Sequence, residues 1–309
     1  MKRITLLLAL APIVAACDSP VAEPPDEGRP ARLVVAGSLQ NDKLRESSGI
    51  ARSARNPEVF WLHNDSGDKA RLYAIDTQGR HRGRLRLDKS DNRDWEDIAS
   101  FTLDGKAYLL VADIGDNNAR HRTSVLYVVE EPDLAAGDEY EFEPAWRIRF
   151  RYPGGPRDAE AAAVDTAGQR VLILSKRELP PALYAVPLMP DNDEAVVAEK
   201  LGPVTSLPPP TRQDIEFATQ RKDWSWQPTA MDLSADGSAA LILTEAAVYY
   251  FPFDGDWLST LNQQALGFGL RGVRNAESAA FGADSRQIYI TFEGRNAPLL
   301  RIDMDNSTQ

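Results

Sequence analysis

The chain has 309 residues, of which 46 are acidic and 35 basic, giving a formal net charge of -11 and a pI of about 4.9. This balance argues against a nucleic-acid partner, because phosphate backbones require a basic surface, and anionic lipid headgroups would repel the chain as well. The single cysteine excludes an internal disulfide.

The N-terminus has the form of a bacterial lipoprotein signal peptide, which we assign to residues 1–16. Lys2 and Arg3 precede an apolar stretch, residues 4–13, that is too short to span a membrane as a helix. The next four residues, Val14-Ala15-Ala16-Cys17, resemble the lipobox, whose cysteine is lipidated and becomes the first residue of the mature chain. An ordinary cleaved signal with an incidental cysteine is the alternative.

Asp18 follows the cysteine, and an aspartate there resembles the signal that retains lipoproteins in the inner membrane. Residues 17–30 are predicted to form a lipidated, proline-rich tether without an apolar period. We therefore expect a chain on the periplasmic side of a bacterial cell envelope, held to the membrane through lipid on Cys17, with one folded domain at residues 31–309.

A short pattern recurs along that domain. An acidic residue precedes a small or apolar run, a turn follows, and the next strand ends in polar residues. The copies begin at Glu46, Asp94, Asp158 and Asn275, with a weaker copy that lacks the acid at Thr229. Repeats of short strands at this spacing indicate a single all-β domain, a β-propeller of four-stranded antiparallel blades. Five blades can be recognised, and a sixth is possible.

The second unit is the clearest, with strands predicted at residues 98–103, 107–112, 125–129 and 146–150. The pair Asp104-Gly105 favours a tight hairpin between the first two of these strands.

The last unit stops after its third strand, and an extra strand at residues 33–36 precedes the first acidic motif. We therefore predict that this N-terminal strand completes the last blade and removes an exposed sheet edge.

Three stretches stand apart from the repeat. Residues 203–227 fit no unit and are either an insertion or a degenerate sixth blade. Residues 258–266 could form one short helix. Residues 80–86 alternate arginine with other side chains, which we interpret as protection of an outer sheet edge.

Propeller geometry places the polar residues of the repeat on one surface. The innermost strand and the second strand of a blade run antiparallel, so the start of the first lies beside the end of the second. The motif openings should therefore lie near the second-strand ends, at residues 63–68, 113–117, 175–178, 244–245 and 292–295. This predicts a ring of mostly carboxylates and amides at one mouth of the central channel.

Crowded carboxylates raise one another's pKa unless a cation offsets their charge. Ca²⁺ takes several oxygen ligands in flexible geometry, and Asp65, Asp68, Asp113 and Asp116 offer such oxygens at short spacing around glycines. The alternative is that these segments are only turns, since Asp, Asn and Gly favour turns regardless of function.

Three further side chains are candidates for chemistry at this mouth. His63 could act in acid–base catalysis or metal ligation, or be a buried structural histidine. Lys176 and Arg177 could hold a phosphate or a carboxylate, or form salt bridges with Glu160 or Glu178. No Ser/His/Asp triad can be assigned.

A set of motifs resembles uncharacterised bacterial secreted propellers, which are similar in turn to the phytase-like and esterase-like propeller families. The motifs are Glu46-Ser47-Ser48-Gly49-Ile50-Ala51, His63-Asn64-Asp65-Ser66-Gly67-Asp68, Trp95-Glu96-Asp97-Ile98-Ala99, Ala112-Asp113-Ile114-Gly115-Asp116-Asn117 and Asp158-Ala159-Glu160-Ala161. Propeller phytases have six blades, hold Ca²⁺ at an acidic mouth and bind phosphate with Lys and Arg. This chain departs from them, because it has five clear units and matches no phytase motif residue for residue.

The resemblance implies two sets of site residues. Its ion ligands would be Asp65, Asp94, Glu96, Asp97, Asp113, Asp158, Glu160 and Glu277. Its phosphate contacts would be Lys176, Arg177 and Arg295.

Three functional hypotheses follow, and the fold does not select among them. The first is a monomeric, lipid-anchored envelope propeller that binds a small anionic ligand or an envelope protein through an acidic, Ca²⁺-binding mouth. The second is a metal-dependent phosphoesterase, with Glu96 or Asp97 as the base, His63 as a further acid–base candidate, and Lys176 and Arg177 on the anion. The third is a purely structural propeller whose outer rim binds partners. We place the first ahead, because no activated nucleophile is visible.

Overall fold

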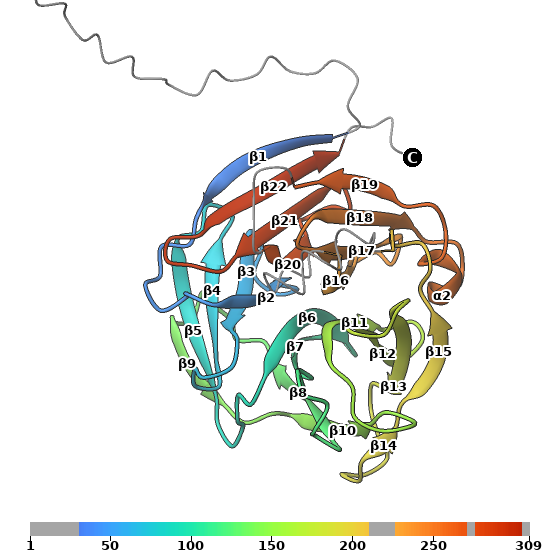
Figure 1. Ribbon diagram of the computed structural model, residues 1–309. Helices are drawn as coiled ribbons and strands as arrows, with labels where there is room; N and C mark the ends of the chain where they lie inside the picture. The colour runs from blue at the N-terminus through green and yellow to red at the C-terminus, as the bar shows by residue number, and fades with distance from the viewer. Residues whose placement is uncertain (1–30, 210–225, 271–275, 305–309) are drawn as a thin grey trace, which may run out of the picture.

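A computed structural model describes residues 31–209, 226–270 and 276–304. The predicted signal peptide, Cys17, Asp18 and the tether lie outside these residues. The described strands form five sheets that radiate around one axis (Figure 1), so the prediction of a five-bladed β-propeller is confirmed. No described helix has the length and apolar character needed to cross a membrane.

Each blade is a sheet whose first strand lies innermost. Blade 1 contains β2 (Ser47–Arg52), β3 (Val59–Asn64), β4 (Arg71–Asp76), β5 (His81–Leu87) and β9 (Glu139–Phe142). Blade 2 contains β6 (Trp95–Leu103), β7 (Lys106–Asp113), β8 (Ser124–Glu130), β10 (Trp146–Arg151) and β14 (Val196–Val197). Blade 3 contains β11 (Ala159–Asp165), β12 (Arg170–Ser175), β13 (Ala182–Pro187) and β15 (Glu199–Pro203).

The last two blades have four strands each. Blade 4 contains β16 (Pro228–Leu233), β17 (Ala239–Thr244), β18 (Ala247–Pro252) and β19 (Leu266–Gly269). Blade 5 contains β20 (Ala276–Phe281), β21 (Gln287–Phe292), β22 (Pro298–Met304) and β1 (Ala31–Ser38). No sixth sheet occurs among the described strands, and the interior of the 203–227 stretch lies outside them. The short helix predicted at residues 258–266 is shorter in the structure: α2 spans Trp257–Thr260, its first turn is capped by Asp256, and β19 already begins at Leu266.

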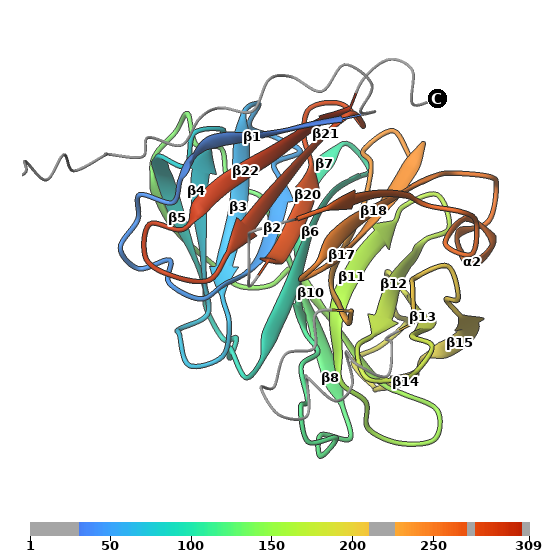
Figure 2. The same ribbon diagram turned by 45° about the horizontal axis from the view of Figure 1, so that its top comes forward.

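The N-terminal strand closes the ring, as predicted. β1 pairs antiparallel with β22 from Ala31↔Met304 to Ser38↔Pro298 (Figure 2), and it thereby supplies the outer strand that blade 5 lacks. Joining the two ends of the domain within one sheet makes closure depend on a ladder of backbone hydrogen bonds.

Two blades carry a fifth strand that the repeat did not predict. β9 leaves blade 2 and pairs parallel with β5 of blade 1, and β14 leaves blade 3 and pairs parallel with β10 of blade 2. The prediction that residues 80–86 protect an exposed edge is therefore wrong. Arg84 bonds to Glu139 at 2.6 Å and Arg86 to Glu141 at 3.1 Å, so the arginines bind the strand that covers them.

The core lies between the blades, where the two faces of adjacent sheets meet. Aromatic side chains on the strands outside the innermost one are buried there, including Trp61, Tyr73, Phe150, Tyr184 and Phe251. The innermost strands contact their neighbours around the channel and are rich in alanine, which allows their close approach. This rigid ring fixes the positions of the residues at the channel mouth.

A candidate cation-binding mouth

Every blade has a β-bulge at the same place, where its innermost strand begins. The register slips between Ser47 and Gly49, Trp95 and Asp97, Ala159 and Ala161, Pro228 and Ala230, and Ala276 and Ser278. One residue per blade is therefore left unpaired, and such bulges redirect a side chain. The five bulge residues are Ser48, Glu96, Glu160, Thr229 and Glu277.

The bulges were not predicted, although the sequence contains a signal for them. In the four acidic or amide copies the bulge residue occupies the third position of the motif, and in three of them it is glutamate; in the weaker copy the bulge residue is Thr229, the first residue. Beside each bulge lies the end of the second strand, as in the pairs Ser47↔Asn64, Trp95↔Asp113 and Ala159↔Ser175. The openings and second-strand ends thus lie on one rim, as predicted.

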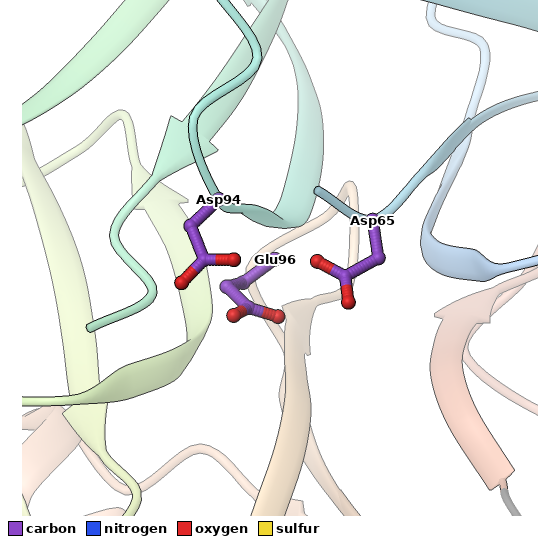
Figure 3. Close-up of side chains that lie close together, drawn as sticks. All are labelled: Asp65, Asp94 and Glu96. Atoms are coloured by element: carbon purple, nitrogen blue, oxygen red, sulfur yellow. The ribbon is translucent and has the colours of Figure 1, made fainter. Parts of the chain in front are cut away.

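Three carboxylates from two blades converge on this rim. Asp65 follows β3 of blade 1, Asp94 directly precedes β6 of blade 2, and Glu96 is the second residue of β6. One oxygen from each lies within 4.8 Å of the others, and Glu96 sits between the two aspartates (Figure 3). Asp65, Asp94 and Glu96 are hereafter the carboxylate trio.

Burial raises the pKa of all three acids, and repulsion adds to it at Asp94 and Glu96, whereas at Asp65 the Ser66 N–H and the Lys176 charge oppose the rise in pKa. Burial and then the charges of Asp65, Asp158 and Asp113 raise the pKa of Asp94 to about 6. Burial, followed by repulsion from Glu160 and the rest of the trio, raises the pKa of Glu96 well above its ordinary value. A cation would relieve this repulsion. Because all three donors are carboxylate oxygens, the set fits a hard cation such as Ca²⁺.

Two neighbouring residues, Ser48 and Gly115, contact the trio. Ser48 donates from Oγ to Glu96 Oε2 at 3.3 Å and to the Glu96 carbonyl at 3.1 Å. Gly115 packs so closely on the acids that a Cβ there would lie 2.1 Å from Glu96 Oε1 and 2.5 Å from Asp94 Oδ2. Ser48 lies in a predicted motif opening and Gly115 inside a predicted second-strand end, but the contacts of both with the trio were not predicted.

The adjoining part of the rim is neutralised by the protein's own bases. Lys176 contacts Glu160 directly, Arg177 Nε lies 2.6 Å from Asp158 Oδ2, and Arg93 Nη2 lies 3.3 Å from Asp113 Oδ1. The predicted alternative of a salt bridge between Lys176 and Glu160 is therefore observed.

Protonation in this part reflects the same contacts. Burial raises the pKa of Glu160 to about 7, with the Lys176 charge acting in the opposite direction. Burial would lower the pKa of Lys176, but Glu160, Glu96 and Glu277 raise it above its ordinary value. Burial and then Glu160 raise the pKa of Glu277 to about 8. Acids that can exchange protons near neutral pH thus surround one buried ammonium group.

Asp68 and Asp116 stabilise turns in this structure. Asp68 Oδ2 accepts from Asn64 Nδ2 at 2.7 Å and from the Tyr73 hydroxyl at 3.2 Å. Asp116 accepts from the backbone N–H groups of Arg120 and His121 at 2.8 and 2.7 Å. These contacts correspond to the turn interpretation. Arg295 is exposed on the connection that follows β21.

His63 and Asp97 lie beneath the mouth and are inaccessible to solvent. Burial lowers the pKa of His63 to about 4, so the ring is neutral, and its Nε2 lies 2.2 Å from where a Cβ on Gly49 would stand. Asp97 is 1% exposed and accepts from the N–H groups of Ile98, Ala162 and Met231. Asp97 thus joins the inner strands of blades 2, 3 and 4.

Comparison with known proteins gives only distant likenesses. No protein-family model matches the chain, and no curated protein matches it. Among solved structures, a gluconolactonase from Xanthomonas campestris is 13% identical, covers 89% of this chain and 90% of its own, and has a TM-score of 0.45. A luciferin-regenerating enzyme is 8% identical, with coverages of 87% and 95% and a TM-score of 0.44.

Proposed function

We propose that this protein is a lipid-anchored propeller of the bacterial envelope that binds Ca²⁺ through the carboxylate trio and uses the bound ion to hold a small anionic ligand. One observation carries the proposal: the trio gathers three acids without a basic contact among the described residues, whereas Asp113, Asp158 and Glu160 beside it each have one. Crowded carboxylates that form no ion pair repel one another, and a bound cation would relieve this repulsion.

The rest of the mouth supports an anionic ligand. Three protein oxygens leave several positions of a Ca²⁺ ion open to other oxygen ligands. Arg177 lies close by, and its Nη1 takes part in neither of the contacts that its Nε and Nη2 make with Asp158 and Asn117. With lipid on Cys17 as the anchor, anionic headgroups would repel the acidic domain from the membrane surface. The mouth would then remain accessible to solutes.

The test is thermal unfolding of the chain starting at Asp18, stripped with chelator and then supplied with Ca²⁺. A ligand that binds only the native state at 100 times its Kd adds about 2.7 kcal/mol of stability and raises the midpoint. We expect this rise in the wild type and its loss in Glu96→Gln. Glu141→Gln, on the exposed outer strand β9, is the matched control and should respond as the wild type does. An unmoved wild-type midpoint would remove the proposal.

A metal-dependent phosphoesterase is the second candidate, favoured by the acids around Lys176. Glu160 and Glu277, with pKa values of about 7 and 8, can donate or accept a proton at neutral pH. A bound ion would polarise a phosphoryl oxygen and promote attack by water. In this arrangement Glu96 helps to hold the ion, Arg177 orients the anion, and Glu160 carries the proton, while Asp97 keeps the inner strands together.

An assay of ester hydrolysis distinguishes the phosphoesterase from a protein that only binds its ligand. A panel of phosphate monoesters is supplied with Ca²⁺ to the wild type, Glu96→Gln and Glu160→Gln. Hydrolysis requires activity in the wild type, loss of Ca²⁺ binding in Glu96→Gln, and loss of turnover with retained Ca²⁺ binding in Glu160→Gln. A Ca²⁺-stabilised protein that turns over no ester leaves binding as the function.

A further inference from the structure

An apolar cavity of about 480 Å³ lies beside the mouth, between blades 3 and 4. Its walls are the connection that follows β12 and the two segments that flank the entry to β16, residues 205–209 and 226–228. Cavities of roughly 300 to 1,000 Å³ are those that hold small molecules. The apolar side chains on its walls include Leu179, Pro181, Leu207, Pro208 and Trp226.

One wall residue is unusually exposed for its type. Leu179 is 63% exposed, and it is one of only six large apolar side chains that are exposed in the described part of the chain. A leucine beside several prolines and a tryptophan forms a continuous apolar surface, and such surfaces mark binding sites more often than isolated apolar residues do.

The same cavity has a charged end, lined by Lys176, Arg177 and Glu178, that joins it to the mouth. Lys176 and Arg177 line it, and these two residues also contact Glu160 and Asp158 on the rim. A molecule with its charged group at Arg177 and the trio would therefore extend its other end along Leu179 into the cavity.

A buried amide provides an independent sign of a ligand. Gln227 lines the cavity and is 8% exposed, and its Oε1 has no hydrogen-bond partner among the described residues. Buried acceptors are nearly always paired, so an acceptor of this kind calls for a donor that the ligand can bring.

We propose that the ligand of this mouth is a small amphiphile, an alkyl ester of phosphoric acid or a close analogue, whose phosphate lies at Arg177 and the cation and whose hydrocarbon chain occupies the cavity. The proposal rests on the proposed function for the position of the charged group. It adds that Leu179 and the apolar wall determine specificity for the chain, and that a hydroxyl of the charged group reaches Gln227.

The test is isothermal titration of alkyl phosphates from ethyl to octyl phosphate into the chain starting at Asp18, with Ca²⁺ present. Each methylene that enters the cavity should tighten binding about threefold, because burying it removes apolar surface from water. Leu179→Ser should weaken octyl phosphate at least fivefold and leave ethyl phosphate within twofold. Leu179→Trp, which narrows the cavity, should reduce the gain with chain length.

Leu33→Ser is the matched control, since Leu33 is a 44% exposed leucine on β1 in blade 5. It should leave the whole series unchanged. Equal affinity for ethyl and octyl phosphate, or no binding by any member, overturns the inference. If Ca²⁺ still stabilises the protein in either case, the proposed function stands. If affinity rises with alkyl chain length but Ca²⁺ does not stabilise the protein, the cavity is supported and the proposed ion site is removed.

Discussion

The second and third blades present nearly the same motif to the mouth and yet create opposite electrostatic environments. Asp94-Trp95-Glu96 and Asp158-Ala159-Glu160 occupy equivalent places, with the glutamate at the bulge in both. In blade 3 both acids have a basic partner, while in blade 2 they face Asp65. The same backbone geometry thus positions a salt bridge in blade 3 and a candidate ion site in blade 2.

The difference arises at one position, the residue directly after the second strand. That residue is Asp65, Ile114, Lys176, Glu245 and Glu293 in blades 1 to 5, so only blade 3 has a base there. Lys176 forms an ion pair with Glu160 and acts at longer range on Glu96 and Glu277, whereas no member of the trio forms an ion pair among the described residues. This asymmetry should respond to substitution on either side.

Removing the internal cation should have the largest effect. Lys176→Met leaves Glu160 buried without its partner, and breaking a buried pair in this way costs about 3 to 5 kcal/mol. We expect the free energy of unfolding in urea at pH 7, with chelator, to fall by that amount. Lys106→Met is the control, because the Lys106–Glu130 pair is exposed and should change stability by less than about 0.5 kcal/mol. The double variant Lys176→Met/Glu160→Gln should recover most of the loss, and failure to do so would contradict the pairing.

An added methyl group should disturb the other side less. In Gly115→Ala the new Cβ would meet both Glu96 and Asp94, so the two carboxylates must move apart. Overpacking of this kind costs about 1 to 3 kcal/mol, and we expect the Ca²⁺-dependent rise in melting midpoint to be lost. Gly269→Ala is the control, since nothing lies within 4 Å of its Cβ position. A normal Ca²⁺ response in Gly115→Ala would show that the trio does not bind the ion.

These contrasts also show which parts of the molecule could be predicted from sequence. Closure by the N-terminal strand followed from a missing strand at one end and a surplus strand at the other. The common rim followed from antiparallel pairing, because the strand period fixes which ends meet. Both conclusions depend only on local patterns and chain order.

The details of the site depend on contacts that no local pattern contains. The strand β9 was missed because its pairing with β5 joins residues about fifty positions apart through exposed charges. The buried role of Asp97 was missed because its donors lie in two other blades. The bulges had a sequence signal in the recurring third-position glutamate, but only the register shows that this residue is unpaired.

The smallest expected effect is on the pH dependence of stability, which should differ between the trio and the acids around Lys176. Raised pKa values mean that the folded state holds protons more tightly than the unfolded state, so apo-protein stability falls as pH rises. For Asp94 this loss spans about pH 4 to 6, and for Glu277 it extends to about pH 8. In a plot of the free energy of unfolding against pH, Asp94→Asn should flatten only the range from about pH 4 to 6. Glu277→Gln should flatten the decline up to about pH 8.

Each change should amount to less than about 1 kcal/mol per pH unit, since a single full proton gives about 1.4 and water reaches both side chains. Urea unfolding at half-unit steps from pH 4 to 9, with chelator, measures the two slopes. Saturating Ca²⁺ should remove the part of the wild-type decline that comes from Asp94, at about pH 4 to 6, and leave the part that comes from Glu277. If both variants flattened the same range, the two sides of the mouth would titrate as one group, and the division between them would be wrong.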